Sequence, residues 1–552
     1  MTTPSRSRSR ATKPPSKPRT VTREPLLDVH EIQGNILAGF NKDFQTLLAV
    51  KIRDVGNARE WLRRILPHIN NTAEVLQFNS LYRERRTRLG HDPVGLVATW
   101  ANIAFSHGGI AALTSLADAD ALDNGKTGAF KFGLPGRAST LGDPVLGTQD
   151  DPTMGWVVGG TGRVPDILLI VASDDHARLL STVAELRPGP ADGKGALEVV
   201  WEEEGRTRPD LPGHEHFGFK DGVSQPGVRG LVSRKPEVFI TPRVLKPPTD
   251  GEIPFSKPGQ PLIWPGQFIL GYPTQDLSSA VGIRARSLKR NWFKNGSFLV
   301  FRRLTQNVAG FAAFLQSEAV RLDHSGNFSG MTPERLGAIL VGRWPSGAPV
   351  SRTPLTDDKV LAGEGLAVND FLYTVDTPAP AFLPDVKPPD PFDAGKSDAF
   401  GLICPLAAHI RKMNPRDQDT DLGPPFDTLA RRILRRGIPF GPPLANPSGG
   451  DDGVERGLHF LCYQTSIVEQ FEKLQMDWAN NPGAPRASGG VDLIIGQTGG
   501  SPRTFNLFTP DGVKVEPLTA PIQWVVPTGG GYFFAPSISA IRDVLARGAK
   551  HV

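Results

Sequence analysis

Glycine and proline interrupt this chain so often that their density limits its folds more than any other feature. The 552 residues include 60 Gly and 51 Pro, about a fifth of the total. Glycine readily adopts left-handed turn conformations and proline lacks a backbone donor, so both break helices and central strands. We therefore expect many turns, long surface loops and modest helix content.

The apolar content supports a sizeable core. Hydrophobic residues make up 39% of the chain and charged residues 22%, which is ordinary for globular proteins. At about 150 residues per domain, this length predicts two to four domains. The best uninterrupted apolar run, at 167–172, has the length of one buried strand, so we expect no membrane-spanning helix.

Basic charge is concentrated at the N-terminus. Residues 1–24 contain seven Lys or Arg residues and one acid, which leaves 55 basic and 56 acidic residues in the rest of the chain. The pI of about 9.1 therefore reflects the tail. A nearly neutral body argues against a nucleic-acid groove. A solvated arm is the simpler interpretation of the tail, although such arms can also bind acidic surfaces.

The tail and the cysteines favour a reduced, cytoplasmic protein. No apolar segment follows the basic residues of the tail, so we expect no secretory signal peptide. Cys404 and Cys462 are the two cysteines of the chain, and neither belongs to a CxxC pattern. A single disulfide between them stays open, but a disulfide framework is excluded.

Strands and helices alternate through the first half, after a basic tail at 1–25 that we expect to be disordered. The apolar spacing predicts strands at 44–52, 97–105, 166–172 and 197–201, and helices at 57–66, from 110 to at least 116, and up to 186. Asp174 is the expected cap of the last helix. The order strand, helix, strand, strand, helix, strand is that of a ferredoxin-like α+β sandwich.

The second half repeats this alternation. Strands are expected at 267–272, 297–301, 432–435, 457–463 and 532–535, and helices at 308–320, 466–478 and 537–546. The predicted fold class is thus α+β, with two ferredoxin-like domains whose antiparallel sheets have helices packed around them. We place these domains at 26–240 and 266–552, joined by a Pro-rich linker at 241–265. A loop-rich insertion is expected near 351–391.

Two segments contain residue types suited to catalysis or cofactor binding. Gly218 and Gly222 frame Asp221, which suggests a tight loop that fixes a carboxylate; an ordinary turn aspartate is the alternative. His409 lies between an apolar run and a basic cluster that includes Arg411. This setting suits haem, because His can bind the iron and arginine can bind the propionates. A buried core histidine is the alternative.

A third segment contains adjacent arginines, Arg435 and Arg436. On a strand their side chains point to opposite faces, so one of them would face inward and need a negative partner.

The pattern His214-Glu215-His216, just before Gly218, could bring two imidazoles to a metal. No third His or Cys is near it and no HExxH is present, so ordinary loop residues are the simpler interpretation.

Together these segments resemble the dye-decolorising peroxidase family. Residues 218–222 match its most diagnostic motif, the GxxDG loop. Residues 32–37 are similar to its entry segment, 297–304 to its central strand, and 457–464 and 530–536 to its closing strands. The length and the insertions resemble the larger, fungal-type branch. The resemblance covers nearly all of the chain after the tail. It implies two ferredoxin-like domains, with one non-covalent haem b per chain held mainly by the second and covered by the GxxDG loop.

The resemblance also implies residue roles. His409 would be the proximal iron ligand, Asp221 the distal acid-base group and Arg435 the distal arginine, a role that suits Arg436 less well. Gly218 and Gly222 would shape the loop at the cofactor, and Arg411 is our candidate for a propionate.

At one plausible position for the acidic partner of the proximal histidine the chain has Gln523, and Phe440 stands where relatives can carry Tyr. Weak candidates for an electron relay to bulky dyes are Tyr463, Trp478 and Trp524.

The implied activity is reduction of hydrogen peroxide to water, coupled to one-electron oxidation of dyes, phenols or similar aromatic donors. A carboxylate base has a reference pKa near ~4, so we expect activity to favour acidic pH. A haem or porphyrin carrier without turnover is the alternative. Asp221 and Arg435 favour the enzyme, because carriage requires neither. A nucleic-acid module is the weakest interpretation, and a homo-oligomer stays open.

Overall fold

The computed structural model describes residues 24–123, 128–235, 237–245, 253–277, 283–285, 287–376 and 395–548. Most of the predicted tail and much of the predicted insertion lie outside these ranges. Glu24, which the sequence analysis placed in the tail, is packed, because its carboxylate accepts hydrogen bonds from Arg229 and Arg243 (3.2 and 2.6 Å). No helix of the described ranges is long and apolar enough to cross a membrane.

Two strand arrays with the same order form the centre of the molecule. In the first, β1 (Phe44–Ile52), β2 (Thr99–Phe105), β3 (Ile167–Ser173) and β4 (Leu197–Arg206) lie in the order β4-β1-β3-β2. The second contains β10 (Ser297–Gln306), β11 (Leu434–Arg435), β12 (Ile438–Phe440), β13 (Gly457–Gln464) and β16 (Val525–Ala535). Its order is β16-β10-β13, with β11 and β12 as one interrupted strand on the far side of β13. Both arrays therefore have the ferredoxin-like order that the sequence predicts.

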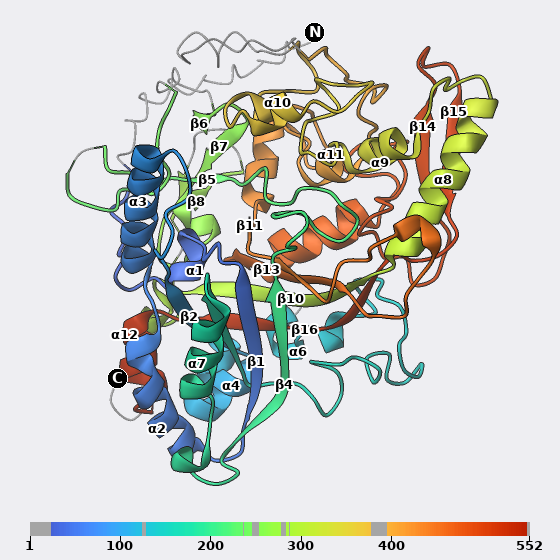
Figure 1. Ribbon diagram of the computed structural model, residues 1–552. Helices are drawn as coiled ribbons and strands as arrows, with labels where there is room; N and C mark the ends of the chain where they lie inside the picture. Colours follow the sequence, from blue (N-terminus) through green and yellow to red (C-terminus); the bar gives the residue numbers. More distant parts are fainter. Residues whose placement is uncertain are drawn as a thin grey trace, which may run out of the picture.

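The two arrays join edge to edge into one closed sheet. Phe440 of β12 pairs with Gly205 of β4, and Phe534 of β16 pairs with Phe105 of β2. Closure leaves the edge strands of both arrays paired, which protects them from pairing with other chains. In Figure 1, β10 and β16 cross the centre of the view, and the helices α8 (Val308–His324) and α9 (Pro333–Val341) lie at the upper right. The two parts of the chain that show the same alternation of strands and helices thus form the two halves of one barrel.

Alternate residues of the barrel strands enter two different cores, as the two-residue strand period requires. Leu47 and Phe301 belong to a core shared with Ile36 of the N-terminal segment. Their neighbours Leu48 and Val300 belong to a second core, which contains the helix residues listed here: Trp61, Leu62, Leu179 and Val183. Helix residues therefore pack on both faces of the sheet, since Ile36, Leu37 and Val75 enter the first core.

The remaining elements surround the barrel. The helices are α1 (Gly34–Leu37), α2 (Val55–Ile65), α3 (Thr72–Leu89), α4 (His107–Leu113), α5 (Leu116–Leu122), α6 (Ala129–Phe132), α7 (His176–Leu186), α8 (Val308–His324), α9 (Pro333–Val341), α10 (Lys359–Gly363), α11 (His409–Met413), the π-helix Ile467–Ala479 and, at the C-terminus, α12 (Ile538–Ala540). The small strands are β5 (Gly227–Val228), β6 (Phe255–Lys257), β7 (Gln260–Ile263), β8 (Thr274–Gln275), β9 (Ile283–Arg284), β14 (Arg503–Phe508) and β15 (Val515–Ala520).

Most predicted elements are present, and β1 has the predicted bounds. The strand predicted at 267–272 is wrong: Pro265–Gln267 forms a 3-10 turn, and these apolar residues fill the core from a turn. The cap of α7 is Asp175, not Asp174, which pairs with Lys42 (2.5 Å). Helix α3 was missed because it is largely polar and exposed. Cys404 and Cys462, both within the described ranges, are buried free thiols rather than a disulfide.

Candidate active site

A cavity of about 310 Å³ lies between the loop that follows β4 and the elements of the second half. Asp221 enters from that loop, Arg435 from β11 and His409 from the start of α11, and all three line the cavity. The apolar part of the wall includes Phe219, Leu458, Phe460, Phe471, Leu474 and Ile494. The structure thus brings together the three side chains to which the sequence analysis assigned chemistry.

Asp221 and Arg435 form an ion pair inside this cavity, although 214 positions separate them. Nη1 of Arg435 donates to Oδ1 of Asp221 at 2.5 Å, and Nη2 donates to the Ser224 carbonyl at 3.1 Å. Removal from bulk water raises the pKa of Asp221. The charge and hydrogen bond of Arg435 outweigh this effect, so the pKa lies below the usual aspartate value. The carboxylate is therefore ionised and ready to accept a proton.

Backbone geometry explains why glycines frame Asp221. Gly218 and Gly222 have φ angles of +95° and +74°, in the left-handed region that side chains disfavour. No heavy atom lies within 4 Å of a Cβ built on either glycine, so conformation and not space requires them. The Asp221 N–H donates to the Gly213 carbonyl (2.9 Å), and the Gly222 N–H donates to Asp221 Oδ1 (2.6 Å). The expected tight loop is present.

His409 has a buried acidic partner. Its Nδ1 lies 2.8 Å from Oδ2 of Asp492, whose side chain is fully buried. The other carboxylate oxygen accepts the N–H groups of Ile494 and Ile495 (2.8 and 3.2 Å). Donation of the Nδ1 proton to this carboxylate leaves Nε2 as the basic nitrogen. The sequence analysis left this partner unplaced: Gln523, at one plausible position, donates instead to the Gly496 carbonyl (3.1 Å), and nothing in the sequence pattern singles out Asp492.

Arginines that the sequence analysis did not select also line the cavity, namely Arg343, Arg416 and Arg432. Within the described ranges, none of the three forms an ion pair, and Nε of both Arg416 and Arg432 is buried without a hydrogen-bond partner. Burial lowers the pKa of Arg343 and of Arg432 to about 9. Guanidinium groups in this state call for an anionic partner.

These residues fit haem. A histidine with a free basic nitrogen can bind iron, arginines without an ion-pair partner can bind the two propionates, and apolar walls suit the porphyrin face. Arg411 does not belong to this set and does not line the cavity. Its guanidinium binds Oδ2 of Asp398 at 2.8 Å and Oε1 of Gln418 at 2.8 Å. The expectation that Arg411 meets a propionate is corrected in favour of the cavity arginines.

Comparisons with known proteins agree with this site. Residues 31–209 match the family model described as DyP dimeric alpha+beta barrel domain. The dye-decolorizing peroxidase msp1 of Mycetinis scorodonius is 32% identical over 98% of this chain and 94% of its own length. The chain belongs to the dye-decolorising peroxidase family. Its enzyme class is that of the family, a peroxidase, and the family implies a haem cofactor.

Solved structures of this family share the fold. An ancestral D-type dye-decolorising peroxidase aligns with a TM-score of 0.72 at 34% identity, covering 94% of this chain and 99% of that structure. A single-site mutant of the dye-decolorising peroxidase from Pleurotus ostreatus gives 0.73 at 30% identity, with the same coverage. A multifunctional dye peroxidase of Amycolatopsis is 28% identical over 95% of this chain. The fungal relatives are the more similar ones and support assignment to the fungal-type branch.

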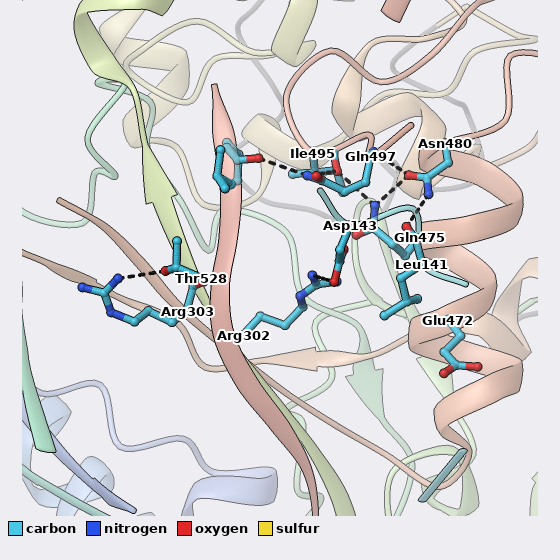
Figure 2. A network of polar contacts seen from close by, with 12 residues as sticks. Leu141, Asp143, Arg302, Arg303, Glu472, Gln475, Asn480, Ile495, Gln497 and Thr528 are labelled. Carbon is cyan, nitrogen blue, oxygen red and sulfur yellow. Dashed lines mark hydrogen bonds and ion pairs between the residues drawn. The ribbon is translucent and has the colours of Figure 1, made fainter. Parts of the chain in front are cut away.

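A buried polar network forms the wall of the peroxidase cavity beside β10. Figure 2 shows Arg302 pointing toward Asp143, with Nη2 2.6 Å from Oδ2, and both side chains are almost fully buried. Above them Gln475 donates to Asn480 Oδ1 (2.9 Å), which also accepts the N–H of Gln497 (2.8 Å). Nε2 of Gln497 donates to the Val525 carbonyl (3.1 Å) and so links the end of the π-helix Ile467–Ala479 to β16.

Other residues considered for the peroxidase site lie elsewhere. Arg436 donates to the carbonyls of Asn35, Ile36 and Leu37, so Arg435 is the arginine that faces the cavity, as expected. The side chains suggested as surface relays are all buried, with exposed fractions of 0 to 1%: Tyr463, Trp478 and Trp524. None of these three can meet a bulky dye at the surface.

Proposed function

We propose that this chain reduces hydrogen peroxide and oxidises dyes, phenols or similar aromatic donors by one-electron steps. His409 would bind the iron of one haem b held non-covalently in the cavity. Arg343, Arg416 and Arg432 hold its propionates. Bound haem supplies the redox-active iron and stores the two oxidising equivalents of peroxide. The observation that carries the proposal is the Asp221–Arg435 ion pair in the cavity that also receives His409.

Asp221 moves one proton between the two oxygen atoms of peroxide. Its carboxylate accepts the proton of the inner oxygen and returns it to the outer oxygen, which already carries a hydrogen and leaves as water. Arg435 stabilises the negative charge that develops on the outer oxygen as the O–O bond breaks. On the other side, Asp492 holds the Nδ1 proton of His409 and keeps Nε2 basic.

The test is a comparison of cofactor binding with turnover. We expect the protein to bind haem with a defined visible spectrum and to oxidise a dye with hydrogen peroxide. Asp221→Asn should lower the rate of reaction with peroxide by about 10²-fold or more while leaving haem content unchanged. His409→Ala should change the spectrum itself. Haem binding without dye oxidation would support a carrier, and an unchanged peroxide rate in Asp221→Asn would contradict the proposed acid-base role.

A further inference from the structure

Glu215 is a second carboxyl in the cavity wall, six residues before Asp221. It belongs to the pattern that first suggested a metal, but the flanking imidazoles do not converge with it. Nε2 of His214 lies 3.1 Å from the Pro345 carbonyl, and Nε2 of His216 lies 2.8 Å from the Phe440 carbonyl. No group of three or more His, Cys, Asp or Glu residues that could hold a metal occurs in the described ranges. Glu215 therefore needs another explanation.

The Glu215 side chain binds the backbone of the loop that carries Asp221. Oε1 accepts the N–H of Phe219 at 2.9 Å, and Oε2 accepts the N–H of Phe217 at 2.9 Å. The backbone of Glu215 closes the same turn, since its N–H donates to the Phe219 carbonyl (3.1 Å) and its carbonyl accepts the N–H of Gly218 (3.0 Å). One residue thus holds the segment that immediately precedes Lys220 and Asp221.

Gln306 connects this turn to the barrel. Its Nε2 donates to Oε2 of Glu215 at 2.5 Å, and its own N–H donates to the Arg456 carbonyl at 2.9 Å. Gln306 is the last residue of β10, which is paired on both sides. The loop is therefore tied to β10, a strand that is paired with neighbours on both sides.

A carboxylate suits this position better than an amide. Three N–H donors, from Phe217, Phe219 and Gln306, converge on the two oxygens of Glu215. An amide offers one acceptor oxygen, so its NH₂ group would face a donor and leave it unsatisfied, which is costly inside a protein. Enclosure raises the pKa of Glu215, and the nearby charge of Asp221 adds to this effect, while the three donors oppose it.

We propose that Glu215 is a positioning residue for Asp221. Its carboxylate and the Gln306 amide fix the loop between its two flexible glycines, so that Asp221 meets Arg435 in the cavity. This inference rests on the proposed function, in which Asp221 is the acid-base group. It adds that the ion pair depends on a clamp that holds the loop and is separate from Asp221 and Arg435 themselves.

The test uses haem-loaded Glu215→Gln, with the rate of peroxide reaction measured across pH by stopped-flow spectroscopy. We expect a loss of about tenfold or more, within the range of general acid-base catalysis. We also expect the acid limb of the profile to move to higher pH, because an Asp221 that leaves Arg435 regains a higher pKa. Loss of a negative charge alone would move this limb to lower pH, since Asp221 would then ionise more easily. A limb that stays in place or moves down overturns the proposal.

Hydrogen exchange provides a readout that does not depend on turnover. The amides of Phe217 and Phe219 should exchange faster in Glu215→Gln than in the parent protein, in both the haem-free and the haem-loaded states. Gln306→Met, which keeps the carboxylate and removes its anchor, should shift the acid limb in the same direction by a smaller amount. If Glu215→Gln folds poorly, Gln306→Met tests the clamp in its place. Unchanged exchange in both variants contradicts the clamp.

Two controls separate this inference from the proposed function. Glu203→Gln removes a carboxylate that pairs with His459 and Arg303 and does not line the cavity; it should lower stability without moving the acid limb. Asp221→Asn tests the acid-base role directly. If Asp221→Asn abolishes the fast peroxide reaction and Glu215→Gln leaves it intact, the positioning role alone fails. If Asp221→Asn has no effect, the proposed function fails first.

Discussion

Nδ1 of His409 lies 2.8 Å from Oδ2 of Asp492, a contact between segments 83 positions apart. The carboxylate is fully buried and accepts two backbone N–H groups through its other oxygen. Such a fixed acceptor orients the imidazole and makes it a stronger donor to a metal. In the proposed haem complex, Asp492 would therefore influence the electron density at the iron without touching it.

Asp492→Asn should weaken this effect without removing the hydrogen bond altogether. A neutral amide draws less on the Nδ1 proton, so the imidazole becomes a poorer donor and the ferrous state gains relative to the ferric state. We expect a higher Fe(III)/Fe(II) reduction potential and a loss of about 10- to 100-fold in peroxide turnover. Spectroelectrochemical titration measures the first quantity. Gln523→Leu is the control that should leave the potential unchanged.

Arg435→Leu should change the pH dependence as well as the rate. Arg435 holds the pKa of Asp221 below its usual value, and ionised Asp221 is the active form, so the parent activity falls only below that depressed pKa. Without the guanidinium, enclosure is the largest remaining effect on the pKa of Asp221, and it raises this pKa. The acid limb should therefore move to higher pH, and the rate at its maximum should fall by about 10²-fold or more. A limb at the parental pH would show that Asp221 does not titrate in this step.

The sequence predicts the fold well where local patterns and tertiary burial agree. Residues 44–52 contain the apolar run 47–50 and are rich in apolar side chains, and β1 has these bounds. The segment at 267–272 is equally apolar, but Pro265 and Gly266 start a turn there. A buried turn can have the same apolar composition as a buried strand, so composition alone does not distinguish the two. Closure of the two arrays into one barrel depends on single pairings such as Phe440 with Gly205, which no local pattern encodes.

The candidate site divides in the same way. Asp221, His409 and Arg435 lie in segments with recognisable motifs, and the structure brings them to one cavity. Asp492 and Arg432 were missed because their importance comes from contacts across the fold, and neither lies in a distinctive motif. Arg411 was selected for its place beside His409, but its guanidinium turns toward Asp398, and sequence proximity carries no direction for a long side chain.

The pair of Glu203 with His459 predicts how stability changes with acid. His459 and Arg303 bind Glu203, and although burial opposes them, they lower its pKa from 4.5 to about 2. A carboxyl whose pKa is lower in the folded than in the unfolded protein stabilises the fold at pH values above its unfolded pKa. For Glu203 this contribution is lost as the pH falls from about 4.5 toward 2. The melting temperature of the haem-free protein should drop through this window. Glu203→Gln should have a lower melting temperature at pH 6, and that temperature should fall less on acidification. An equal fall in both proteins would contradict the role given to Glu203.

Arg432 makes opposite predictions for the haem-free and haem-loaded proteins. Its Nε is buried without a partner, its described hydrogen bond is a 3.4 Å contact to Thr428, and burial lowers its pKa to about 9. Arg432→Met should therefore raise the melting temperature of the haem-free protein, because it removes an uncompensated charge. It should also weaken haem binding by about 10- to 100-fold, the value of one charge-assisted hydrogen bond. Arg411→Met, which breaks the pair with Asp398, should instead lower the haem-free melting temperature. Tighter haem binding by Arg432→Met would show that this arginine does not hold a propionate.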